Sequence, residues 1–129
     1  MNEISESQAD SILQFLARRS GYDTYELRNY KYYDNVEYAT PVFTLNSQGY
    51  GLYIKESKFL NLVKILPQSN LDIYSKKWML QYLLSQKHLL YAKSVWIFNS
   101  PPTKTWQKVF KESDTLESLL IESNLSQGV

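Results

Sequence analysis

A tyrosine-rich stretch, YELRNYKYYDNVEY, runs from Tyr25 to Tyr38 and holds five of the eleven tyrosines of the chain. Tyrosine and arginine are enriched at the centres of protein interfaces, where mixed charges suit a protein partner. Aromatic rings among cations also stack on nucleic-acid bases. A third interpretation needs no partner, because tyrosine forms strands well and can bury its ring while its hydroxyl stays in water.

If the stretch binds a partner, we expect it to form a basic aromatic sheet face together with residues on neighbouring strands. The residues expected on this face are Arg28, Tyr30, Lys31, Tyr32, Tyr33, Tyr53 and Lys55. Acids lie among them, including Glu26, Asp34 and Glu56, and their charge would repel phosphate. The mixture therefore favours a protein over a nucleic acid as the partner.

A second pattern is the acid and lysine separated by one residue in Glu56-Ser57-Lys58, at the predicted end of a strand. It resembles the last part of the PD-(D/E)xK nuclease signature, and the predicted order of helix, three strands, helix and strand resembles the core of that fold. The resemblance implies two acids that hold a divalent ion and a lysine that steadies the attacking water. Glu37 is the nearest upstream acid. The proline-aspartate half of the signature is missing, because Thr40-Pro41-Val42 stands there, so the resemblance implies a degenerate form.

Other catalytic and ligand-binding motifs are absent from the sequence. There is no cysteine, which excludes disulfides, thiolate metal sites and a cysteine nucleophile. His88 is the one histidine, and we expect it half-exposed near the end of a helix. The four glycines form no phosphate-binding loop, and no G-x-S-x-G sequence presents a catalytic serine. We therefore expect no catalytic, metal-binding or cofactor-binding residue and no cofactor.

Composition predicts one compact domain over residues 1–129, since 43% of the residues are apolar and 15% are aromatic. The formal charge of +1 gives no overall attraction to nucleic acid or anionic lipid. The first ten residues, MNEISESQAD, are acidic and polar, unlike a signal peptide. No apolar run approaches the roughly 20 residues that span a membrane. We expect a cytoplasmic protein without a membrane partner.

The residue pattern predicts an α+β fold that begins with a helix. Ser5 and Gln8 have the spacing of a capping box, and Gly21 can end the helix in the left-handed conformation. Arg18 and Arg19 fall in its last turn, where we expect a solvated helix end, with a phosphate site as the alternative.

An antiparallel meander of three to four strands should follow this helix. The expected strands cover about 24–33, 42–45, 50–55 and 59–66. The tyrosine run breaks the alternation of the first strand, which predicts a bulge near Asn29. Pro41 lies near the start of the second strand, where its missing amide hydrogen is tolerated.

The second half should hold a long core helix, one further buried strand and short C-terminal helices. We expect the core helix over about 71–90, capped by Ser69 or Asn70, and the strand over 94–99. Short helices are expected over about 105–111 and 114–122, the second capped by Ser113. Three leucines of the last helix, Leu116, Leu119 and Leu120, should pack on the sheet, with docking in a partner's groove as the alternative.

These observations favour a small protein-interaction module without catalytic activity, an adaptor, inhibitor or assembly factor that uses its tyrosine-rich sheet face. The alternative is a nucleic-acid-associated protein with a degenerate PD-(D/E)xK-like nuclease fold. The surroundings of Glu56 separate the two hypotheses. A second carboxylate within about 4–5 Å of it would favour a metal site.

Overall fold

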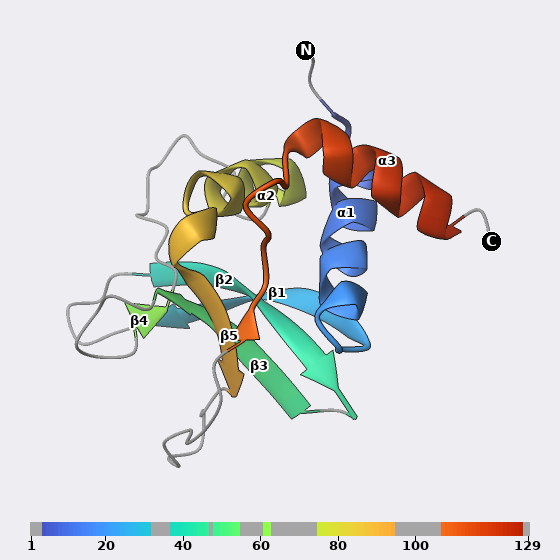
Figure 1. The fold of residues 1–129 in the computed structure, drawn as a ribbon. Helices are drawn as coiled ribbons and strands as arrows, with labels where there is room; N and C mark the ends of the chain where they lie inside the picture. The colour runs from blue at the N-terminus through green and yellow to red at the C-terminus, as the bar shows by residue number, and fades with distance from the viewer. Residues whose placement is uncertain are drawn as a thin grey trace.

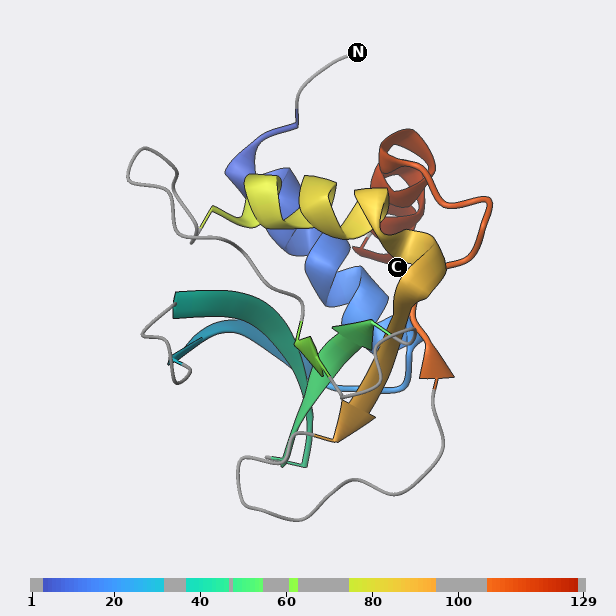
Figure 2. The same cartoon turned by 90° about the vertical axis from the view of Figure 1, so that its left-hand side faces the viewer.

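The computed structural model describes residues 4–31, 37–46, 48–54, 61–62, 75–94 and 107–127. Within these ranges three α-helices lie on one side of a six-stranded antiparallel sheet (Figure 1). Figure 2 shows the same two layers from the side, with the helices above the strands. The predicted α+β fold, with an N-terminal helix, an antiparallel meander and a C-terminal helix, is confirmed.

Helix α1 (Glu6–Arg19) begins and ends as the sequence predicts. The Ser5 hydroxyl accepts a hydrogen bond from the Gln8 amide at 3.0 Å, and the Gln8 side chain accepts one from the Ser5 amide at 2.8 Å. Gly21 follows the helix at a φ of 94°, in the left-handed region that glycine adopts without strain. The apolar stripe of α1 is fully buried at Ile12, Leu13 and Leu16.

Strands β1 (Thr24–Lys31) and β2 (Glu37–Leu45) form a long hairpin. Their register runs without a skipped residue from Thr24 opposite Thr44 to Lys31 opposite Glu37. The bulge predicted near Asn29 is therefore wrong, because each residue of 24–31 pairs with one residue of 37–44. Asn46, at a φ of 51°, leads from β2 into β3 (Gln48–Ile54).

Strand β2 begins earlier than predicted, so that Pro41 lies in its middle. The pairing of β2 with β3 runs from Leu45 to Val42 and ends one residue before Pro41. Proline has no amide hydrogen to donate, which explains why the ladder stops there. The short strand β4 (Asn61–Leu62) pairs with the last two residues of β3. The rest of the strand expected over 59–66 lies outside the described residues.

The second helix is shorter than predicted. Helix α2 (Lys76–Ser85) is capped by Ser75, whose hydroxyl accepts the Trp78 amide at 3.2 Å, rather than by Ser69 or Asn70. A 3₁₀ turn, η1 (Lys87–Leu89), and strand β5 (Leu90–Ser94) follow it. Leu90 fits the apolar stripe of a helix as well as the alternation of a strand. The predicted helix therefore ended too late in the sequence.

The C-terminal part also differs from the prediction. Strand β6 (Gln107–Lys108) pairs with β5 in the region where a short helix was expected. Residues 95–99 of the predicted buried strand lie outside the described residues. Helix α3 (Leu116–Gln127) is capped by Thr115, whose hydroxyl accepts the Ser118 amide at 3.0 Å, and not by Ser113.

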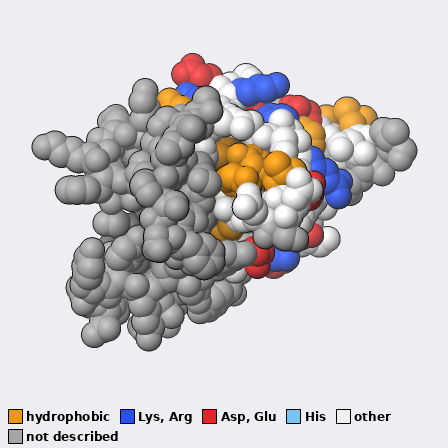
Figure 3. Space-filling model, turned by 90° about the horizontal axis from the view of Figure 1, so that it is seen from below, with side chains coloured by type: hydrophobic (Ala, Val, Ile, Leu, Met, Phe, Trp, Pro, Cys, Tyr) orange, Lys and Arg blue, Asp and Glu red, His pale blue; other side chains and the backbone are white. Residues whose placement is uncertain are grey.

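The main core lies between the sheet and the helices. Phe43, Leu52 and Leu90 are fully buried there against the apolar side of α1 and α2. Helix α3 packs mainly on α1 and not on the sheet as expected, and its Leu119 is fully buried, so this leucine packs on its own chain. On the other face of the sheet, apolar side chains gather beside the residues drawn in grey (Figure 3). Val42 alternates with Phe43, faces that side and is nevertheless fully buried.

Candidate protein interface

The predicted partner-binding residues are spread over two strands and over parts of the chain outside the described residues. Three of them, Arg28, Tyr30 and Lys31, lie in β1, and Tyr53 lies in β3; for these four the structure describes the backbone. The others, Tyr32, Tyr33 and Lys55, are outside the described residues. The sheet order places β2 between β1 and β3, so the strands that carry these residues are not neighbours.

The nuclease-like residues are not brought together in the described part of the chain. Glu56 and Lys58 lie outside it, and Glu37 is the first residue of β2, opposite Lys31. Within the residues that the structure describes, no group of three histidine or acidic side chains is placed to hold a metal ion. The predicted pair of carboxylates remains a prediction.

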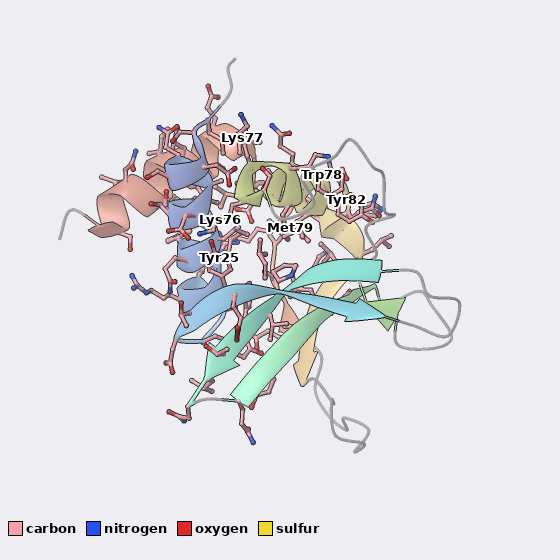
Figure 4. The ribbon with its side chains drawn as sticks, turned by 180° about the vertical axis from the view of Figure 1, so that it is seen from behind. Tyr25, Lys76, Lys77, Trp78, Met79 and Tyr82 are labelled. Carbon is pink, nitrogen blue, oxygen red and sulfur yellow. The ribbon has the colours of Figure 1, made fainter. Side chains whose placement is uncertain are left out.

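The clearest candidate for a binding surface is the outer edge of the sheet at β1. In the sheet order β1-β2-β3-β5-β6, this eight-residue strand is the first, and among the described residues it pairs with β2 alone. Figure 4 looks onto this edge, with β1 at the front of the sheet. In an antiparallel pair alternate residues direct their N–H and C=O groups away from the partner strand. Half of the residues of β1 therefore offer main-chain donors and acceptors to a further strand.

The first residues of this edge are tied to α1. The side-chain amide of Gln14 donates to the Asp23 carbonyl at 2.8 Å, and the Thr24 hydroxyl donates to the Gln14 carbonyl oxygen at 2.6 Å. These contacts fix where β1 starts. Farther along, Leu27 packs on the core while Glu26 is exposed, so the strand keeps one apolar and one polar side.

A cluster of three polar side chains holds β1 against both helices. The Tyr25 hydroxyl donates to Asp10 Oδ1 at 2.5 Å, and Lys76 Nζ donates to the same oxygen at 3.0 Å. Lys76 Nζ also lies 5.8 Å from the centroid of the Tyr25 ring. Figure 4 shows Tyr25 and Lys76 where α1, α2 and β1 meet. The cluster thus joins three elements behind the open edge.

The protonation states of this cluster suit a structural contact. Burial, together with the hydrogen bond to Asp10, raises the pKa of Tyr25 well above its ordinary value. The hydrogen bond from Tyr25 lowers the pKa of Asp10, and Lys76 adds to this effect against the opposing influence of burial. The phenol therefore stays protonated and donates to a carboxylate. A phenol in this state is a poor general base.

The aromatic side of α2 belongs to the core. The rings of Trp78 and Tyr82 stack with centroids 5.5 Å apart and planes 5° from parallel. Both side chains are half-buried against the core, and burial raises the pKa of Tyr82. Figure 4 shows them on the same helix as Met79, which is fully buried. The core position predicted for this helix is confirmed at these residues.

The C-terminal turn of α1 is solvated, as predicted, at only one of its two arginines. Arg18 is exposed as predicted, but Arg19 donates to both carboxylate oxygens of Asp114, at 3.2 and 2.6 Å, and to the Val109 carbonyl at 3.1 Å. The Asp114 side chain is 2% exposed. The prediction was wrong for Arg19 because its partner lies 95 residues away in the sequence.

Comparison with protein-family models, with curated proteins and with solved structures gave no match. Of the helices in the described residues, none is both long and apolar enough to span a bilayer. The function must therefore be argued from the residues of this chain alone.

Proposed function

We propose that this chain is a protein-interaction module, an adaptor, inhibitor or assembly factor, that binds an extended segment of a partner protein along β1. One observation carries the proposal: β1 is eight residues long and, in the described part of the chain, pairs on one side only. A partner segment that adds as a further strand would pair with the outward main-chain groups of β1. Main-chain pairing of this kind provides affinity, and side chains along the strand provide specificity.

The sequence of β1 supports selective binding of one partner segment at this edge. Long unprotected edges aggregate, and charged side chains on the edge oppose this. Within TYELRNYK, an acid and two bases are spaced along the strand, at Glu26, Arg28 and Lys31. Such a mixed pattern favours a partner segment with the complementary charge order and disfavours others. The tyrosine-rich face predicted from the sequence remains part of the proposed interface.

The proposal needs no catalytic step. The described polar clusters are used to join elements: Tyr25 and Asp10 hold β1, and Arg19 and Asp114 hold the segment before α3. We place the protein in the cytoplasm as part of the same proposal, because a chain without cysteine cannot form the disulfides that are common in small secreted domains.

The test is a capture experiment with tagged protein in lysate of the source, with and without nuclease treatment. The wild type is compared with Glu26→Lys in β1 and with Glu117→Lys, the same charge change at an exposed residue of α3. Thermal unfolding first checks that both variants fold. We expect a defined protein that survives nuclease treatment, that is lost with Glu26→Lys and that is retained with Glu117→Lys.

Hydrogen exchange on the purified complex then locates the interface. Slower exchange of the β1 amides on binding supports strand addition. Slower exchange confined to other elements contradicts it. Recovery of nucleic acid alone would favour the nuclease-like alternative, which magnesium-dependent cleavage by wild type and Glu56→Ala would then test.

A further inference from the structure

A pocket with a volume of about 250 Å³ lies at the opposite edge of the sheet from β1. It is lined by Lys87, His88, Lys108, Lys111 and Glu112. These residues come from η1, from β6 and from the segment between β6 and α3, and β6 is the last strand in the sheet order. Three of the five side chains are cationic, and one is acidic. This pocket is therefore separate from the proposed interface.

The ammonium group of Lys87 is fixed in place by neutral acceptors. Its Nζ donates to the Glu112 carbonyl at 2.7 Å and to the Asp114 carbonyl at 2.6 Å. An ammonium has three N–H donors, so one remains beyond these two bonds. Neither carbonyl carries a charge that would cancel the positive charge of Lys87. A half-buried cation is thus held rigidly at the wall of the pocket.

The side chain of Asp114, whose backbone carbonyl accepts a hydrogen bond from Lys87, does not neutralise this wall. Both carboxylate oxygens of Asp114 accept hydrogen bonds from Arg19, and one of them also accepts the Lys111 amide at 2.8 Å. Asp114 is buried and its charge is balanced by the guanidinium. Among the described lining residues, the positive charges of the pocket therefore face one carboxylate, that of Glu112.

Two exposed lysines complete the positive lining. Lys108 lies in β6, and Lys111 lies three residues later, before α3. With His88 neutral, three lysines and one glutamate give the lining a charge of +2, whereas the whole chain carries +1. Converging ammonium groups attract a compact anion, and lysine is a common ligand of phosphate.

We propose that this pocket binds a phosphate group, either as the free ion or on a small phosphomonoester. Lys87, Lys108 and Lys111 contact the phosphate oxygens, and His88 offers a further N–H donor. The volume is several times the roughly 30 Å³ taken up by one water molecule, so part of the molecule that carries the phosphate also fits. The Glu112 carboxylate accepts a hydrogen bond from a hydroxyl of that molecule. It also repels anions that lack such a hydroxyl.

The test is a titration of the ¹⁵N-labelled full chain, followed by NMR, with inorganic phosphate, glycerol 3-phosphate and sulfate. We expect saturable shifts of the amides of η1 and of residues 107–114, with glycerol 3-phosphate tighter than inorganic phosphate. If inorganic phosphate bound more tightly than glycerol 3-phosphate, the free ion would be identified as the ligand. Equal shifts with all three anions would show non-specific screening and would overturn the proposal.

Three variants distinguish specific phosphate binding in the pocket from non-specific attraction to positive charge. Lys108→Gln and Lys111→Gln should each weaken phosphate binding roughly tenfold, since a hydrogen bond to a charged group contributes about that factor. Arg18→Gln removes an exposed cation from α1 and should leave binding unchanged. Absence of saturable shifts in the wild type, or the same affinity in all variants, would refute the proposal. Capture of a protein partner through β1 should survive Lys108→Gln, so the two proposals can fail independently.

Discussion

The carboxylate of Glu6, in the first turn of α1, accepts a hydrogen bond from the backbone amide of Lys77 in α2 at 2.8 Å. The same oxygen, Oε1, also accepts a hydrogen bond from the Ser75 hydroxyl at 2.9 Å, and Oε2 accepts the Lys76 amide at 2.9 Å. The first amides of a helix have no partner within that helix, and its N-terminus carries partial positive charge. One residue of α1 therefore caps α2 across about 70 residues of sequence.

Replacing Glu6 should weaken the whole domain, because the cap joins two core helices. We expect Glu6→Ala to lower the free energy of unfolding by about 1–2 kcal/mol, the range measured for lost helix caps. Glu117→Ala, at an exposed acid in the first turn of α3, is the matched control and should cost less than about 0.5 kcal/mol. Urea unfolding followed by circular dichroism measures both. Equal losses in the two variants would show that the cap adds nothing beyond an ordinary surface charge.

The ion pair of Arg19 and Asp114 should make stability depend on acid pH. Burial acts to raise the pKa of Asp114, but the hydrogen bonds from Arg19 and from the Lys111 amide outweigh it and hold the pKa below its ordinary value. A lowered pKa in the folded state contributes stability that is complete above the unfolded value, near 3.8, and is lost as the pH falls through the folded value. Between pH 5 and about pH 2, the unfolding free energy of the wild type should therefore fall more steeply than that of Asp114→Asn.

The same variant should also be less stable at neutral pH. Asp114→Asn leaves the guanidinium of Arg19, whose side chain is 16% exposed, without its charged partner. Breaking a buried pair in this way costs roughly 3–5 kcal/mol, and Arg19→Lys, which keeps the charge but loses the two-pronged contact, should cost less. Parallel slopes against pH for wild type and Asp114→Asn would show that other groups cause the acid sensitivity.

Local signals in the sequence predicted the start and end of α1 and the antiparallel meander. Ser5, Gln8 and Gly21 act through hydrogen bonds and backbone conformations within a few residues, so their spacing alone identifies the helix ends. The start of α2 could not be predicted in this way. Its cap, Ser75, acts together with Glu6, and a carboxylate supplied from a distant helix leaves no local pattern.

The polar clusters could not be predicted from the sequence for the same reason, because their partners lie far apart in the chain. The position of Arg19 in the last turn of α1 predicted a solvated charge, whereas the fold brings Asp114 to it from the other end of the chain. The pocket for which we propose phosphate binding likewise joins residues 87–88 to residues 108–112 through the pairing of β5 with β6. The strand assigned to β6 is two residues long, too short for its alternation to be read against the surrounding helical pattern.

The hydroxyl of Tyr25 should stabilise the junction of β1 with the helices. Tyr25→Phe keeps the half-buried ring and removes the hydrogen bond to Asp10, so we expect a loss of about 1 kcal/mol. A double-mutant cycle with Lys76→Met measures the coupling, since both side chains donate to Asp10 Oδ1. Strictly additive effects would show that the two contacts are independent. Because the folded pKa of Tyr25 is raised, its contribution is complete below pH 10 and should be lost as the pH rises further.

The same substitution should change the stability strongly at one leucine of α3 and very little at another. Leu119 is fully buried against α1, whereas Leu125 is 68% exposed. Leu119→Ala should lower the free energy of unfolding by about 2–5 kcal/mol, because it removes buried apolar surface and leaves a cavity. Leu125→Ala should change it by less than about 0.5 kcal/mol. If urea unfolding gave a large loss for Leu125→Ala as well, that exposed leucine would have to be covered in solution, and concentration-dependent sedimentation would then show whether a second copy covers it.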